Sequence, residues 1–483
     1  MKKIFKFSYF IVILVVSFNC SKEYEVPQDL VVNDFIWKGL NAYYLHQDQV
    51  ADLSDKRFNS DQELNAFLAG FTDYTQLFSG LLISTDAKST LIEDYTLLED
   101  VPLRTLTTNG MEFGIISSPE NSINVLGYVS HILPDSDAST KDIKRGDFFY
   151  AVNGTPLTRD NFLSFLSNSL SNITLEMADF DGTTVIPNTK QVVLESTAYP
   201  YPAIYLEKTI GMGGKNIGYL MYNNDFSTNY LIDLNSSFLN FKNQSVTELV
   251  LDLRYNIGGG SFAKNIAKIA TMITGQFTDD VVLKKEWNTK AQTWFLANQP
   301  DSLITKFSTQ LNSNTNLNSL GLTDIYLILN GDSFTGSSAV ELLINSLKPY
   351  INVHLIGNTT SGNNTGSITL YNSEDYNFTL TNQIHTVAIQ PIVLRFLNKD
   401  DETYESGFAP NIKLCENEDI LNLGILGETS DPILNDVLNY ISTGITPPIS
   451  CNSQNFEYIY NSLTPQREID KGVLIHQDLP NTN

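Results

Sequence analysis

Basic residues are scarce in this chain, and their scarcity excludes one large class of partner. The 483 residues include 30 Lys and Arg against 54 Asp and Glu, which gives a formal net charge of −24. Nucleic-acid binding depends on clustered Lys and Arg that displace counterions from phosphates, so this composition excludes it. The acidic surface predicts solubility, and any partner is expected to be neutral or basic.

Metal-binding and phosphate-binding motifs are also missing. The five histidines are dispersed along the chain, and none stands in an H-E-x-x-H motif or a Cys/His cluster. The glycine run at 258–260 lacks the lysine that would follow in a phosphate-binding loop. The sequence therefore predicts a protein without a metal ion or another cofactor.

No apolar run in the chain is long enough to cross a bilayer. Lys2, Lys3 and Lys6 precede a mostly apolar stretch over residues 7–18, whereas roughly 20 apolar residues are needed to span. A basic start followed by a short apolar stretch is typical of a secretory signal. We therefore expect an exported protein, with a signal over residues 1–19 and a tether over residues 20–30.

Cysteine is rare, with three residues. Cys20 closes the signal, and the segment resembles a bacterial lipoprotein signal. That resemblance implies a lipid anchor at Cys20 and a place in the cell envelope, in the periplasm or at the outer membrane; a plainly cleaved signal is the alternative. Cys415 and Cys451 can form a disulfide in an oxidising compartment or remain separate thiols.

Hydrophobic periodicity divides the rest of the chain into four regions. A small helical domain is predicted over residues 31–100, because apolar residues recur at helical spacing after Asn33 and Asp34 and again over residues 61–78. Either Asn33 or Asp34 can cap the first helix. Short strands and turns predict a β-rich domain over residues 101–197. Alternating apolar strands and helices predict an α/β core with a mainly parallel sheet over residues 198–430, followed by an extension over residues 431–483.

Ser338 is the candidate nucleophile. It follows the apolar strand IYLILN at 325–330 and begins an amphipathic helix. The carboxyl ends of such strands are where ligands bind, and a helix N-terminus favours an oxyanion. The same residue types also suit an ordinary loop and helix cap, so this segment alone leaves both interpretations open.

Three segments together resemble the C-terminal-processing (tail-specific) serine peptidase family. They are DLRYNIGGG at 252–260, the helix start SAVE at 338–341, and the loop GNTTSGN at 357–363; the resemblance is closest to exported versions from Bacteroidetes-type bacteria. It implies a ClpP/crotonase-like protease core in which Ser338 attacks and the backbone amides of Gly258 and Ala339 hold the oxyanion. The glycines also suit a tight strand-to-helix turn.

The β-rich region resembles a PDZ domain. The strand EFGI and the later GD and VNG turns carry the resemblance, and a generic small β-rich domain is the alternative. A PDZ domain implies peptide or protein C-termini as partners, bound as a strand added beside the EFGI strand. The implied substrate-binding residues are Glu112, Phe113, Gly114 and Ile115.

The lysine that serves as general base in this family is missing. Its position is occupied by Asn363, whose amide can hydrogen-bond a hydroxyl but cannot take its proton. Lys348 should lie at the far end of the Ser338 helix, and His354 and His385 do not match the position of a histidine base. Glu341 can orient a hydroxyl or serve as an acidic partner of the helix dipole.

Two functions therefore remain open. The first is an exported serine-type endopeptidase (a hydrolase) that cleaves proteins captured by their C-termini. The second is a catalytically inactive family member that binds peptides. A proton acceptor within roughly 3 Å of Ser338 Oγ distinguishes them.

Overall fold

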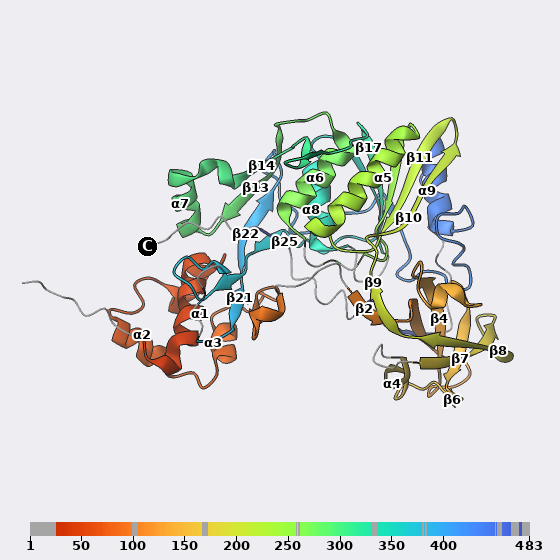
Figure 1. Cartoon of the computed structure of the whole chain (residues 1–483), viewed down its shortest axis with the longest axis horizontal. Helices are drawn as coiled ribbons and strands as arrows, with labels where there is room; N and C mark the ends of the chain where they lie inside the picture. The colour runs from red at the N-terminus through yellow and green to blue at the C-terminus, as the bar shows by residue number, and fades with distance from the viewer. Residues whose placement is uncertain are drawn as a thin grey trace, which may run out of the picture.

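The computed structural model describes residues 26–98, 105–166, 172–256, 258, 261–330, 336–378, 381, 384–449, 451, 456–464 and 473–475. The predicted signal and Cys20 lie outside these residues. Figure 1 shows a group of N-terminal helices at one end, an antiparallel sheet at the other, and a large α/β part above them.

The N-terminal part consists of short helices: α1 (Val31–Tyr43), α2 (Asp61–Leu68) and α3 (Tyr74–Gly80). The apolar stripe predicted for the first helix is buried, at Phe35, Ile36, Leu40, Tyr43 and Tyr44. The predicted cap was wrong, because a 3-10 turn leads directly into α1 and places Asn33 and Asp34 inside its first turn. The second stretch is divided into α2 and α3, and each begins at a side-chain cap, Ser60 and Asp73.

The antiparallel sheet follows in the chain. Its order is β24-β3-β4-β5-β7-β8, and the strands are β3 (Met111–Ser117), β4 (Val125–Ile132), β5 (Phe148–Val152), β7 (Asn172–Phe180), β8 (Val185–Glu195) and β24 (Tyr458–Asn461). The short helix α4 (Phe162–Leu166) packs on one face through Phe162 and Leu166. The predicted VNG turn joins β5 to β6 (Thr155–Pro156), with positive φ at Asn153 and Gly154, as a two-residue hairpin turn requires.

The α/β part is built on a six-stranded sheet of order β10-β11-β12-β17-β18-β23. The strands are β10 (Ile204–Met212), β11 (Lys215–Tyr222), β12 (Glu248–Asp252), β17 (Asp324–Ile328), β18 (Asn352–Gly357) and β23 (Ile412–Lys413). All neighbours are parallel except β10, which agrees with the mainly parallel sheet predicted from the sequence.

Helices cover both faces of this sheet, as Figure 1 shows. One face carries α5 (Leu231–Asn243), α6 (Ala263–Thr274) and α8 (Ser338–Leu347), and the other carries α9 (Pro432–Thr443). The strand residues alternate accordingly: Leu249 and Leu251 pack with the first group, and Val250 packs with α9. Burial on both faces explains why these strands are nearly continuous apolar runs.

A second sheet connects this core to the N-terminal helices. Its order is β14-β13-β22-β19-β25, with β13 (Val281–Trp287), β14 (Ile304–Lys306), β19 (Thr365–Ser367), β22 (Ile392–Leu397) and β25 (Val473–Leu474). After β13, Asn288 caps α7 (Thr289–Asn298) and donates to the carbonyls of Ala42 and Tyr44 at the end of α1. Three small ladders complete the fold: β2 (Thr105–Thr108) with β9 (Thr197–Pro200), β15 (Gln310–Asn312) with β16 (Thr315–Asn316), and β21 (Ala388–Gln390) between β1 (Thr90–Ile92) and β20 (Leu370–Tyr371).

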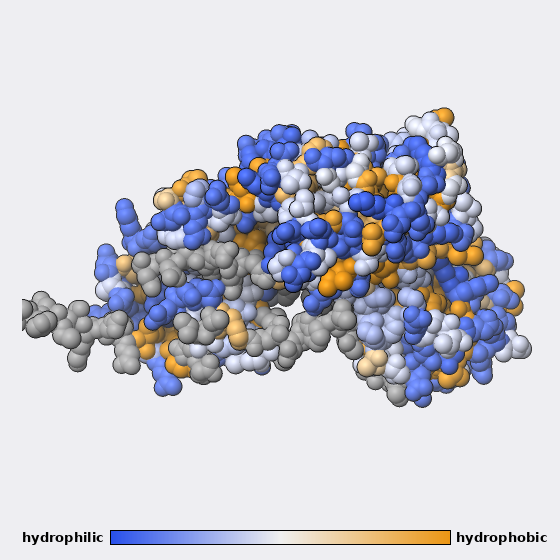
Figure 2. Space-filling view, turned by 45° about the horizontal axis from the view of Figure 1, so that its top comes forward, coloured by the Kyte–Doolittle hydropathy of each residue, from blue (hydrophilic) through white to orange (hydrophobic). Residues whose placement is uncertain are grey.

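Cys415 and Cys451 form a disulfide, with their Cα atoms 5.6 Å apart. It joins the segment after β23 to the segment after α9. Within the described residues no helix is long and apolar enough to cross a membrane, and no three His, Cys, Asp or Glu side chains gather as metal ligands. Figure 2 shows a mostly hydrophilic face on which hydrophobic residues are scattered, in keeping with the acidic composition.

Candidate active site

Ser338 lies in the first turn of α8, after the parallel strand β17. Ser337 is the N-cap residue with extended backbone angles, and Ser338 is only 2% exposed. The first backbone N–H groups of a helix have no intrahelical acceptor. The N–H of Ala339 is one of these, and it can therefore donate a hydrogen bond to an anion. The local geometry is the strand-to-helix placement expected for a nucleophile.

Asn363 is in direct contact with this serine. Its Nδ2 donates a hydrogen bond to Ser338 Oγ, while its Oδ1 accepts one from Thr365 Oγ1 at 2.9 Å. In this orientation the amide directs its nitrogen to Ser338 and its oxygen to Thr365. Asn363 therefore donates to the hydroxyl oxygen, the opposite of what a general base does.

Glu341 holds the Asn363 loop against α8. Its buried carboxylate accepts from the N–H of Gly362 at 2.6 Å, from the N–H of Asn363 at 2.8 Å and from Ser361 Oγ at 3.2 Å. Charge-assisted bonds of this kind are stronger than neutral ones, so Glu341 positions the residue that faces Ser338. The sequence offered Glu341 as an orienting group but gave no sign that the Asn363 loop was its target.

Gly258 is described, whereas Ile257, Gly259 and Gly260 lie outside the described residues. Gly258 has φ +67°, and its N–H donates to Asn256 Oδ1 at 3.0 Å. The buried Asn256 is itself held by the Asn224 carbonyl. In this conformation the Gly258 amide is therefore engaged within its own loop, and holding an oxyanion requires it to turn.

The other candidate bases lie in other surroundings. Lys348 is the C-cap of α8, and its Nζ lies over the ring of Phe408. His354 is hydrogen-bonded to Asp324 at 3.0 Å and to Tyr440 at 3.3 Å. His385 contacts Asn372 and the Val387 N–H. These contacts give each side chain a structural role away from Ser338, as expected from the sequence.

The predicted peptide-binding residues Glu112, Phe113, Gly114 and Ile115 all lie in β3. The edge of β3 that a peptide would join is paired with β24, a strand from the C-terminal extension of the same chain. The groove predicted to receive a peptide is therefore filled by the chain itself in this structure.

A buried charge cluster connects the antiparallel sheet to the α/β core. Arg254, directly after β12, pairs with Asp252 and Asp431 at 2.8 Å and with Glu418 at 3.1 Å. Glu418 also pairs at 2.8 Å with Arg145, which lies in the loop before β5. The sequence contained Arg254 within a recognised motif but gave no indication of these partners, which come from positions far apart in the chain.

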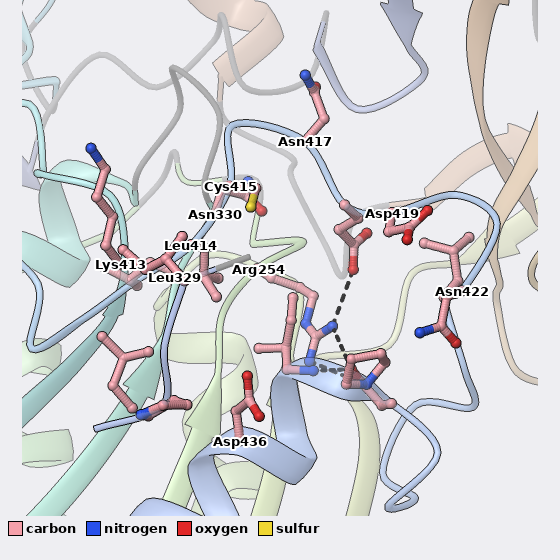
Figure 3. Close-up of a pocket in the computed structure, with 18 of the residues that line it drawn as sticks. Arg254, Leu329, Asn330, Lys413, Leu414, Cys415, Asn417, Asp419, Asn422 and Asp436 are labelled. Carbon is pink, nitrogen blue, oxygen red and sulfur yellow. Dashed lines mark hydrogen bonds and ion pairs between the residues drawn. The ribbon is translucent and has the colours of Figure 1, made fainter. Parts of the chain in front are cut away.

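Arg254 lines a pocket that Figure 3 shows in close-up. The volume of this pocket is about 260 Å³. Leu329 and Asn330 at the end of β17, Lys413 in β23 and the start of α9 also line it. Neither Ser338 nor Asn363 is among the lining residues, so this pocket is distinct from the candidate active site.

The cluster predicts a specific acid sensitivity. Burial alone would raise the pKa of Glu418, but the charges of Arg145 and Arg254 and the hydrogen bond from Tyr255 outweigh burial and hold this pKa at about 2. The stability that Glu418 contributes is thus complete above its ordinary pKa of 4.5 and lost as the pH falls from 4.5 toward 2. Burial raises the pKa of Asp431, which opposes a part of this loss.

We therefore expect Glu418→Gln to be less stable than the wild type at pH 6, with a difference that shrinks below pH about 4.5. The measurement is the free energy of unfolding of both proteins in urea between pH 6 and about 2.5. A difference that stays constant over this range would contradict a charge-based role for Glu418.

Comparison with known proteins identifies the family to which this chain belongs. A serine at the start of a helix, after a parallel strand and facing a loop side chain, defines a peptidase-like α/β protein. The sequence matches the model of peptidase family S41 over residues 216–414 and the model of the peptidase S41 N-terminal domain over residues 31–95. These matches cover more than half of the chain, which belongs to peptidase family S41.

A solved structure shows the same fold. The chain resembles a candidate S41 protease from Bacteroides fragilis NCTC 9343, with 21% identity and a TM-score of 0.65, over 85% of this chain and 97% of that one. It also matches the photosystem II D1 C-terminal processing protease, with 15% identity and a TM-score of 0.45, over 88% of this chain and 99% of that one. A further match is mature CPAF, with 12% identity and a TM-score of 0.41, over 87% and 99% of the two chains. A search of curated proteins found no match.

Proposed function

We propose that this chain is a peptide-binding member of family S41 whose serine has lost its general base. The observation that carries the proposal is the hydrogen bond from Asn363 Nδ2 to Ser338 Oγ. Activation of a serine needs a group that accepts its proton, and an amide nitrogen that donates to the oxygen does the reverse. Loss of one member of a catalytic unit costs several orders of magnitude in rate.

A second candidate function, serine-type endopeptidase, is favoured by one specific observation. Ser338 keeps its buried place in the first turn of α8, and Glu341 holds the facing loop through three hydrogen bonds. In this function Ser338 attacks the scissile carbonyl, and the amides of Ala339 and Gly258 receive the oxyanion once Gly258 turns away from Asn256.

The peptide partner would bind in the groove of a PDZ-type domain, between β3 and α4. The antiparallel sheet with a helix packed on it supports this assignment, and the pairing of β24 with β3 indicates that this edge accepts an added strand. Extended peptides, including the C-termini of proteins, are the proposed ligands. The core would be of the ClpP/crotonase-like type.

Export to the cell envelope, with a lipid anchor at Cys20, completes the proposal. The Cys415–Cys451 disulfide supports it, because structural disulfides persist mainly in oxidising compartments. Mass spectrometry of protein purified from a bacterial envelope should find a lipid-modified Cys20 as the first residue. An N-terminus that begins elsewhere would contradict the anchor.

The test of function compares the wild type with Ser338→Ala in two assays. Release of fluorophore from labelled casein measures hydrolysis, and anisotropy of labelled peptides measures binding. Equal, background hydrolysis by both proteins is the expected result, together with peptide binding that is measurable only at peptide concentrations far above 10 µM, because β24 already pairs with β3. Hydrolysis by the wild type that disappears in Ser338→Ala would establish the endopeptidase and overturn the proposal.

A further inference from the structure

The edge of β3 is occupied by an antiparallel strand from the same chain. Residues Tyr458, Tyr460 and Asn461 of β24 lie opposite Ile116, Ile115 and Gly114. The Ser462 N–H donates to the Phe113 carbonyl at 2.9 Å, and the Ser117 N–H donates to the Glu457 carbonyl at 2.8 Å. These are the backbone contacts by which a bound peptide extends a sheet.

Tyr460 fills the space between the sheet and α4. Its ring centroid lies 6.0 Å from that of Phe113 in β3 and 5.5 Å from that of Phe162 in α4. A few residues on, Leu463 is fully buried in the cluster beneath α9. The strand therefore supplies a pocket-filling aromatic residue as a peptide ligand would, and it is anchored in the core immediately afterwards.

The contacts at Glu112 and Phe113, near the start of β3, favour a strand that continues past this point over a free C-terminus. The Phe113 N–H donates to Ser462 Oγ at 3.0 Å, and this hydroxyl donates to the buried Glu112 carboxylate. When this segment leaves, a free C-terminal carboxylate at this place would lie next to the Glu112 carboxylate, to which the Ser462 hydroxyl now donates. Like charges at short range oppose binding.

The same extension also covers the strand that leaves the Asn363 loop. The Leu474 N–H donates to the Ser261 carbonyl at 2.8 Å, and the Ile475 N–H donates to the Ser367 carbonyl at 3.1 Å. β19 begins at Thr365, two residues after Asn363. Residues 473–475 thus lie between two segments, one at Ser261 directly after the glycine run and the other β19 directly after the Asn363 loop.

We infer that residues 457–463 are a built-in ligand of the β3–α4 groove and that an external peptide binds there only when this segment leaves. The inference rests on the peptide-binding part of the proposed function and not on hydrolysis. It also assigns the class of partner: an extended internal segment with an aromatic side chain at the Tyr460 position, rather than a free C-terminus. A tethered ligand acts at an effective concentration of order mM, so micromolar peptide does not compete with it.

The test uses a labelled peptide with the sequence of residues 456–464, blocked at both ends, and the full chain carrying Ser338→Ala to prevent cleavage. Anisotropy should show no binding at about 10 µM peptide to this protein or to its Tyr460→Phe variant. Tyr460→Asp, which places a charge between Phe113 and Phe162, should bind the peptide at least tenfold more tightly. A shorter peptide of residues 456–462 that ends in a free carboxylate at Ser462 should bind more weakly than the same shorter peptide with a blocked C-terminus.

A Tyr460→Asp protein that keeps the wild-type circular dichroism and cooperative melting but binds no better would overturn the inference. If that variant does not fold, a protease site at the exposed Ile445 followed by reduction of the disulfide frees the extension from the folded protein. Peptide binding after release would then support the inference, and its absence would overturn it. Hydrolysis of casein by the wild type would overturn the proposed loss of activity and leave this inference standing, whereas absence of peptide binding to the freed groove would overturn this inference.

Discussion

Asn363→Lys is expected to raise the rate of casein hydrolysis by about 10²–10⁴-fold over the wild type, the range that a positioned general base contributes. The Asn363 side chain already reaches Ser338 Oγ. Glu341 holds the loop through the backbone N–H groups of Gly362 and Asn363 and through Ser361 Oγ, so the substitution leaves all three contacts untouched. The side chain of a lysine at position 363 is therefore expected to extend toward Ser338.

Two controls separate base catalysis from a general change in the site. Asn363→Met matches the length of lysine without a basic group and should remain at the wild-type rate, and Ser338→Ala combined with Asn363→Lys should be inactive. The activity of Asn363→Lys should rise with pH, because only the neutral amine accepts a proton. Equal gains in the lysine and methionine variants would contradict the proposed reason for low turnover.

The fold was largely predictable because its signals are local. The buried strands around Leu249 and Leu327 are apolar runs, and the helices carry stripes at helical spacing. The beginning of α1 was misplaced because a 3-10 turn replaced the side-chain cap. The pairing of β24 with β3 could not be predicted, since it joins residues more than 300 positions apart and four residues carry little periodicity.

The site was predictable only in part, for a related reason. Ser338 and Asn363 could be located by their motifs, and the structure brings them into contact. What each residue does depends on partners that motifs do not contain. The Asn363 amide directs its nitrogen to the serine and its oxygen to Thr365, and the Asn256 contact decides where the Gly258 N–H points.

A groove filled by its own chain and a serine that faces an amide donor are consistent with each other. The extension pairs through Val473–Leu474 with β19, the strand that follows the Asn363 loop. A chain that does not hydrolyse peptides, as proposed above, would leave such a strand intact. Holding a peptide strand, in cis or from a partner, is then the function for which the described contacts are suited.

Arg254→Met is expected to lower the free energy of unfolding by about 3–5 kcal/mol, the cost of breaking a buried ion pair by removing one partner. Arg254 is 1% exposed and lies between two buried carboxylates, Asp252 and Asp431. Without the guanidinium their charges are uncompensated, and the contact from Glu418 and Arg145 to the core is weakened. Urea unfolding at pH 7, followed by circular dichroism, measures the loss.

Lys284→Ala is the matched control, because Lys284 also pairs with a carboxylate, Asp401 at 2.6 Å, but that carboxylate is 72% exposed. Exposed pairs contribute at most about 1 kcal/mol, so the free energy of unfolding of this variant should be close to that of the wild type.

Asp431→Asn combined with Arg254→Met should recover part of the loss, since the combination removes a buried charge together with its partner. A loss below about 1 kcal/mol in Arg254→Met would show that the cluster does not hold the two sheets together.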